Sequence, residues 1–230
     1  MGSTPSKRPN SAGPPTRGQI ARSFDEIARS FDETRADPWQ EVVTFAGALP
    51  PGSKVIDLGC GNGRHTQVLL ESRHRAIAFD ASRRLLDSAR RRARNADIVL
   101  GDLCALPFGS ASFDAAIAVA SLHHLPTAAD RLVALREIAR ILRPRGRALL
   151  MAWAFEQPRF QETMALRKDR RGPGVGDVWV PWRAGGKDVN RFYHLFEDGE
   201  LPRLALDADL RVERYFRSGD NYAVVAERNG

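Results

Sequence analysis

Cysteines are few in this 230-residue chain, and it has no long apolar run and no metal-ligand spacing. The two cysteines, Cys60 and Cys104, fall within apolar stretches. This argues against a disulfide framework and favours a reducing, cytoplasmic compartment. No apolar run approaches the roughly 18–20 residues of a membrane span, so we expect no membrane insertion. Because cysteines and histidines do not cluster at ligand spacing, we expect no metal site.

Acidic residues are also in deficit. The chain has 35 lysines and arginines against 28 aspartates and glutamates, a net charge of +7. A basic surface favours an anionic partner such as nucleic acid. The first 18 residues are rich in proline, serine and glycine and contain Lys7, Arg8 and Arg17. We therefore predict a disordered basic tail at 1–18 and one domain at 19–230.

Strands and helices alternate along most of the domain. Apolar runs predict strands at 55–58, 75–80, 97–100, 113–120 and 147–154, with helices between them. Such alternation predicts an α/β fold in which helices cover both faces of a mostly parallel sheet of six or seven strands. Two final strands, at 211–216 and 221–227, are joined by only a few residues. One of them is therefore expected to run antiparallel, at the edge of the sheet.

The segment 155–190 breaks this alternation. It is polar, basic and glycine-rich, with a basic cluster at 167–171. Loops of this length in a compact domain usually serve function, so we interpret the segment as a basic substrate lid.

A glycine-rich turn follows the first strand, at Gly59, Gly61 and Gly63. Glycine has no Cβ, so a ligand can lie against the bare backbone of such a turn. A helix begins at Arg64 and directs its free N–H groups into the same space. The turn continues as Arg64-His65 where a P-loop needs Lys-Ser/Thr, so we exclude that loop and predict another nucleotide-type cradle.

Three carboxylates stand at the ends of the first three strands. Asp57 lies where a dinucleotide-binding strand is normally apolar, and it can organise the turn near a ligand ammonium. Asp80 follows Gly61 by 19 residues and is placed to accept hydrogen bonds from ribose hydroxyls. Asp102 comes after the third strand, where a carboxylate can meet an adenine amino group. Ligands of open α/β sheets bind at these carboxyl ends, so we expect one shared site.

Taken in order, the motifs at 55–63, Phe79-Asp80, Gly101-Asp102-Leu103 and Ser112-Phe-Asp114 resemble class I S-adenosylmethionine-dependent methyltransferases. The resemblance implies a Rossmann-like seven-stranded sheet with its last strand antiparallel, and S-adenosylmethionine as the cofactor. It also implies that the glycine turn meets the methionine portion, that Asp80 and Asp102 take ribose and adenine, and that Leu103 contacts the adenine.

The flanking stretches resemble the tRNA wobble-uridine carboxymethyl methyltransferases. The resemblance is carried by 24–39, Ser121-Leu-His-His124, 153–157, 177–182 and 191–201. It implies that the chain forms the methyl ester of a 5-carboxymethyl-type wobble uridine in the anticodon loop of tRNA. Members of this family often work with a small zinc-binding activator along strand three, where Ile98, Val99 and Leu100 would be the matching edge. Phe192 and Tyr222 depart from the residues usual in the family.

Ester formation requires a carboxylate oxygen to attack the sulfonium methyl in line. A carboxylate has a pKa of about 4 and is already ionised at neutral pH, so no general base is needed. A cation that positions the acid is needed instead, and arginine binds a carboxylate with two hydrogen bonds. We predict Arg35 and Arg191 for this role.

Further side chains are predicted around the acid. Tyr193 and His194 are expected as hydrogen-bonding neighbours of the two arginines. His123 or His124, after the fourth strand, is expected to line the substrate pocket. Two other functions remain open at this stage: methylation of a small metabolite, and a non-enzymatic module that binds the cofactor.

Overall fold

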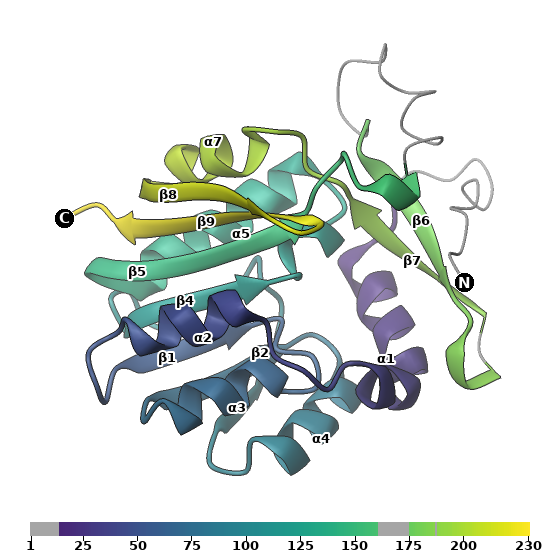
Figure 1. The fold of residues 1–230 in the computed structure, drawn as a ribbon, viewed down its shortest axis with the longest axis horizontal. Coiled ribbons are helices and arrows are strands. Elements are labelled where there is room, and N and C mark those ends of the chain that lie inside the picture. Colours follow the sequence, from purple (N-terminus) through teal and green to yellow (C-terminus); the bar gives the residue numbers. More distant parts are fainter. Residues whose placement is uncertain (1–13, 161–174, 187) are drawn as a thin grey trace.

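The computed structural model describes residues 14–160, 175–186 and 188–230. Its core is a seven-stranded sheet in the order β3-β2-β1-β4-β5-β9-β8, and a separate two-stranded sheet pairs β6 with β7 (Figure 1). The helices are α1 (Arg17–Thr34), α2 (Gln40–Gly47), α3 (Arg64–Glu71), α4 (Arg83–Arg92), α5 (Ala128–Ile141) and α7 (Glu200–Asp207), with short 3-10 helices η1 (Leu122–His124), η2 (Pro158–Phe160) and η3 (Ala184–Gly186). The strands are β1 (Lys54–Leu58), β2 (Arg75–Asp80), β3 (Asp97–Leu100), β4 (Phe113–Val119), β5 (Leu142–Trp153), β6 (Asp177–Trp182), β7 (Val189–His194), β8 (Leu210–Ser218) and β9 (Asn221–Arg228).

The mostly parallel sheet with an antiparallel last strand is confirmed. The first five strands of the sheet pair in parallel, and β9 runs antiparallel to both of its neighbours. The expectation that the reversed strand forms the edge is wrong, because β9 lies between β5 and β8. Its centre is buried on both faces, whereas β8 carries exposed charged residues and is therefore suited to the edge.

Two hydrophobic clusters cover the two faces of the sheet. Helices α2 and α3 pack on the face that contains Val55 of β1, and α5 and α7 pack on the face that contains Ile56. Successive side chains of a strand point to opposite faces, so one apolar run serves both clusters. No helix in the described ranges is long and apolar enough to cross a membrane.

Helix α1 begins earlier than the predicted tail allowed. Thr16 caps it, with a reciprocal pair of hydrogen bonds to Gln19, and Arg17 is its first residue. Such a capping box stabilises a helix start, so the tail can extend no further than residue 15. Residues 1–13 of the predicted tail lie outside the described residues.

The predicted lid contains regular structure. Strands β6 and β7 form an antiparallel hairpin that stands beside α1 at one end of the main sheet (Figure 1). Pro181 argued against a strand at this position, because proline cannot donate a hydrogen bond within a sheet. Proline is nevertheless tolerated at a sheet edge, and Pro181 lies opposite Asn190 in a sheet of only two strands. The basic cluster at 167–171 lies outside the described residues.

The glycine turn brings two helices into close contact. Gly63 caps α3 with a φ of +79°, and a Cβ added there would lie 2.9 Å from the Cα of Ala89 in α4. Gly52 has the same φ of +79°, but a Cβ at that position would meet no atom within 4 Å.

These two glycines separate backbone strain from steric overlap. We expect Gly52→Ala to lower the free energy of unfolding by about 1 kcal/mol, from the left-handed backbone alone. Gly63→Ala should lower it by about 2–4 kcal/mol, because overlap with α4 adds to that strain. Urea denaturation of both variants measures the difference, and equal losses would contradict close packing of α3 against α4.

Candidate functional site

A cavity of about 360 Å³ opens at the carboxyl ends of the parallel strands. Residues of helix α1 form one wall, and two further groups of lining residues are distinguished by the elements that carry them. The glycine-turn half contains Gly59, Gly61, Asp80, Asp102 and Leu103. The hairpin half contains Arg35, His123, His124, Trp153, Arg191 and Tyr193. The structure thus brings together most of the residues predicted from the sequence.

Two predicted cofactor residues do not line the cavity. Asp57 is buried beneath α3, where it accepts a 2.7 Å hydrogen bond from the Thr66 hydroxyl. Burial raises the pKa of Asp57 to about 7. Its place on the α3 side of β1 explains why it connects strand to helix instead of facing a ligand. Gly63 likewise serves the packing of α3 on α4.

Asp80 holds the glycine turn in shape. Its Oδ2 accepts a 2.9 Å hydrogen bond from the Gly61 N–H, and its Oδ1 accepts one of 2.8 Å from the Ser82 N–H. Burial raises the pKa of Asp80, and the backbone donors oppose that rise. Each carboxylate oxygen has a second lone pair, so Asp80 can still accept a hydroxyl from a ligand in the cavity.

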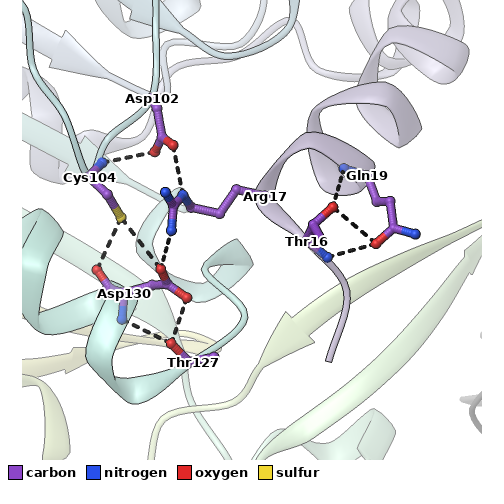
Figure 2. A network of polar contacts seen from close by, with 7 residues as sticks. All are labelled: Thr16, Arg17, Gln19, Asp102, Cys104, Thr127 and Asp130. Atoms are coloured by element: carbon purple, nitrogen blue, oxygen red, sulfur yellow. Dashed lines mark hydrogen bonds and ion pairs between the residues drawn. The ribbon is translucent and has the colours of Figure 1, made fainter. Parts of the chain in front are cut away.

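Asp102 lies at the other end of the glycine-turn half, in the network drawn in Figure 2. Its Oδ1 accepts from the Cys104 N–H at 2.9 Å, and its Oδ2 forms a 2.7 Å ion pair with Nε of Arg17. Arg17 also pairs with Asp130 at the start of α5. The first turn of α1 is therefore tied across the cavity edge. Sequence reasoning missed this role because it assigned Arg17 to the tail, although the capping box at Thr16 signals the helix.

The residues of this half fit S-adenosylmethionine. A Cβ at Gly59 would lie 2.3 Å from Cβ of Ser121, so bare backbone is required where the turn meets the cavity. The Ser121 hydroxyl is buried there and has no hydrogen-bond partner among the described residues. Two strand-end carboxylates, a bare-backbone turn and an unpaired hydroxyl suit the ribose, adenine and amino-acid portions of this cofactor.

Arg191 is a buried cation in the hairpin half. The residue is 5% exposed, and its guanidinium lies 4.6 Å from the centroid of the Trp182 ring. Its Nη1 donates a 2.5 Å hydrogen bond to the Tyr193 hydroxyl, while Nε has no hydrogen-bond partner among the described residues. Within the described ranges no carboxylate forms an ion pair with it. Burial lowers the pKa of Arg191, but arginine stays charged in proteins.

Arg35 approaches the same aromatic ring. Its guanidinium lies 5.6 Å from the Trp182 centroid and donates a 3.1 Å hydrogen bond from Nη1 to the backbone carbonyl of Thr34. Tyr193 stacks on Trp153 at 4.2 Å with an angle of 11° between the rings. Both predicted anchors and the predicted tyrosine therefore face one space.

The sequence predicted that His123 or His124 would line the pocket. In the structure both residues line the cavity. Burial lowers the pKa of His124 to about 3 and that of His123 well below its usual range. Both rings are therefore neutral near pH 7.

His194, predicted beside the arginines, does not line the cavity. Its two ring nitrogens contact Asp177 and Glu200, each at 2.9 Å. Alternation along β7 turns Arg191 and Tyr193 to one face and His194 to the other, a signal that the sequence already contained. His194 instead joins the hairpin to α7.

Several lining residues were not predicted as site residues, among them Trp39 and Arg64. Trp39 and Arg64 lie beside the glycine turn, with the Arg64 guanidinium 5.6 Å from the Trp39 ring centroid. Burial lowers the pKa of Arg64 to about 10. Nothing in the local sequence separates Arg64 from an ordinary first residue of a helix.

Comparisons with known proteins agree with this geometry. Residues 56–150 match the methyltransferase domain family. A tRNA (carboxymethyluridine(34)-5-O)-methyltransferase of Schizosaccharomyces pombe is 32% identical over 91% of this chain and 96% of its own length. Its counterpart in Xenopus tropicalis is 29% identical over 94% of this chain, which spans 43% of that longer protein.

Solved structures share the fold. An S-adenosylmethionine-dependent methyltransferase of Methanosarcina mazei superposes with a TM-score of 0.70 at 18% identity, covering 84% of this chain and 99% of its own. A Haloferax volcanii methyltransferase complexed with the Trm112 methyltransferase activator gives a TM-score of 0.67 at 18% identity, covering 92% and 98%.

Asp80 provides a test of the glycine-turn half. We expect Asp80→Asn to weaken binding of S-adenosylhomocysteine about 10- to 100-fold, because one acceptor oxygen is replaced by a donor. Isothermal titration calorimetry measures the affinity. Asp87→Asn, at an exposed position of α4, is the matched control and should bind normally. Equal affinities for the two variants would show that Asp80 does not contribute to the cofactor site.

His194 makes stability depend on pH. Burial alone would lower the pKa of His194, but the hydrogen bonds to Asp177 and Glu200 outweigh burial and raise it above 6.5. The stabilisation is complete below the pKa of the unfolded chain, about 6.5, and is lost as the pH rises through the folded pKa. Urea unfolding between about pH 6 and 9 should show this loss. The loss should be reduced in His194→Gln, and an unchanged pH dependence would contradict the assignment.

Proposed function

The chain belongs to the family of these tRNA (carboxymethyluridine(34)-5-O)-methyltransferases, and on that premise we propose its reaction. It transfers the methyl group of S-adenosylmethionine to the carboxylate of a 5-carboxymethyl-type wobble uridine in the anticodon loop of tRNA. The observation that carries this proposal is the buried guanidinium of Arg191, which has no carboxylate partner among the described residues.

An unpaired buried cation is costly to the folded protein. Arg191 already has one hydrogen-bond partner, the Tyr193 hydroxyl, and aromatic faces on its flank. A planar carboxylate suits the guanidinium edge that remains, because its two oxygens accept two parallel hydrogen bonds. The arrangement supports a substrate that brings its own carboxylate into the hairpin half.

Positioning is the main chemical task of these residues. S-adenosylmethionine supplies an electrophilic methyl group on a sulfonium. The substrate carboxylate is ionised at neutral pH and loses no proton when the ester forms. The lowered pKa values of His123 and His124 make both rings weak bases, and ester formation requires no base. Arg191 and Arg35 hold the acid near the opening to the glycine-turn half, which favours in-line attack.

An activator subunit is part of the proposal. Strand β3 forms one edge of the main sheet, with Leu100 45% exposed and Ile98 and Val99 partly buried. A small zinc-binding activator of the Trm112 kind would cover this apolar edge. Cys60 and Cys104 are free thiols, which supports a reducing, cytoplasmic setting.

A methyl-transfer assay tests the function. The substrate is tRNA from a Schizosaccharomyces pombe strain that lacks its own relative of this chain, so that the free acid accumulates at the wobble position. Purified protein with labelled S-adenosylmethionine, with and without a Trm112-type activator, should yield a base-labile methyl ester on that nucleoside. Protein that binds S-adenosylhomocysteine but leaves the acid unchanged under both conditions would overturn the proposal.

Arg191 gives the sharper prediction. We expect Arg191→Ala to reduce ester formation at least about 100-fold, the scale of a lost charged hydrogen-bond pair, and to spare binding of S-adenosylhomocysteine. Arg183→Ala removes a 68% exposed arginine beside the same hairpin and should retain activity. Full activity of Arg191→Ala would show that another group anchors the carboxylate.

A further inference from the structure

Two consecutive histidines line the hairpin half of the cavity. His123 and His124 belong to η1, and their ring centroids lie 4.4 Å apart at an angle of 87°. Both rings pack against Tyr193, at 5.1 Å and 4.5 Å between centroids. The mechanism of ester formation uses neither ring as a base, so their placement in the cavity calls for another role.

The backbone fixes the tautomer of His123. Its Nδ1 accepts a 3.1 Å hydrogen bond from the Trp153 N–H. A nitrogen that accepts a hydrogen bond carries no proton, so the proton of the neutral ring resides on Nε2. His123 therefore presents a hydrogen-bond donor at Nε2.

The opposite tautomer is fixed at His124. Its Nδ1 lies 3.0 Å from the carbonyl oxygen of Phe192. Because a carbonyl can only accept, Nδ1 carries the proton and Nε2 keeps a lone pair. His124 therefore presents an acceptor at Nε2. In the part of the chain that the structure describes, neither Nε2 atom has a hydrogen-bond partner.

A donor and an acceptor on two neighbouring lining residues complement the imide edge of a uracil base. We propose that His123 Nε2–H donates to the C4 carbonyl of the wobble uracil and that His124 Nε2 accepts from its N3–H. This inference rests on the proposed function, since it concerns recognition of that substrate. It assigns base selection to two residues that take no part in methyl transfer.

The pair also discriminates against cytosine. Cytosine carries an amino group at C4 and a bare acceptor at N3, so a donor would face the donor of His123 and an acceptor would face that of His124. The base cannot turn over to restore the match, because its C5 substituent has to reach Arg191. Buried polar groups left unpaired in this way are the strongest basis for rejecting a near-isosteric ligand.

The aromatic surroundings suit a base held out of its stack. Phe24 of α1 lies 4.6 Å from the His124 ring, and Tyr193 lies on β7 beside both histidines. Extruded bases are commonly read on this edge by hydrogen bonds while aromatic side chains contact their faces.

The tautomers are tested first, without any substrate. Long-range nitrogen–proton NMR of the histidine rings distinguishes a protonated Nδ1 from a protonated Nε2. We expect His123 to carry its proton on Nε2 and His124 on Nδ1. If both rings show the same tautomer, or if either is charged at pH 7, the inference fails whatever the enzyme methylates.

Base selection is tested with paired substrates. One is an anticodon stem-loop with 5-carboxymethyluridine at the wobble position, and the other carries the N3-methylated form of that nucleoside. We expect the wild-type protein to show about 10- to 100-fold lower kcat/KM on the N3-methylated form. His124→Asn keeps an amide donor for the Phe192 carbonyl but lacks Nε2, so it should lose activity on the first substrate and most of the discrimination.

Controls separate the possible failures. His123→Asn keeps an acceptor for the Trp153 N–H and should lower kcat/KM about 10-fold or more on both substrates, since the N3 methyl leaves the C4 carbonyl intact. His74 is a buried histidine that does not line the cavity, and its Nε2 is hydrogen-bonded to the backbone carbonyl of Ala46. His74→Gln should therefore behave as wild type. Undiminished discrimination in His124→Asn would overturn the inference while ester formation by the wild type upholds the proposed function. Absence of ester in the wild type would overturn both.

Discussion

The hairpin half of the cavity depends on one constraint: the charged guanidinium of Arg191 is buried without a carboxylate partner in the part of the chain that the structure describes. Desolvating such a group costs several kcal/mol unless other groups compensate. The Trp182 and Tyr193 rings and the Tyr193 hydroxyl supply part of that compensation for Arg191. They do so only because β6 and β7 pair, and because His194 on the opposite face joins the hairpin to α7. The fold thus stabilises a cation that has no carboxylate partner among the described residues.

The main sheet could be predicted because its signals are local. Apolar runs bounded by glycine and charged residues mark each parallel strand, and the alternation of strand and helix determines the layers. The place of β9 within the sheet, between β5 and β8, could not be predicted from local signals. Whether a terminal hairpin adds its last strand inside or outside depends on which strand can bury both faces. The alanines and valines of β9 satisfy that requirement, while the charged residues of β8 do not.

The candidate site was predictable where chemistry demands a residue type, as for the strand-end carboxylates of Asp80 and Asp102 and for Arg191, the cation expected to position an acid. The prediction was wrong where the direction of a side chain decides whether it reaches the cavity. Asp57 stands on the α3 side of β1, and His194 stands on the far side of β7, both consequences of alternation along a strand. Arg64 and Arg17 depend on tertiary contacts that no periodicity encodes, because each reaches a partner far from it in sequence.

Helix α1 borders both halves of the cavity. Its first turn is tied to Asp102 through Arg17, Phe31 near its end lies against Gly61 of the glycine turn, and its C-cap Arg35 lies in the hairpin half. One rigid element therefore contributes walls to both halves of the cavity. Any displacement of α1 that admits one ligand changes the surface that the other ligand meets. Such a displacement would link the two binding free energies, and thermodynamics would require the linkage to be reciprocal: each ligand would change the affinity for the other by the same factor.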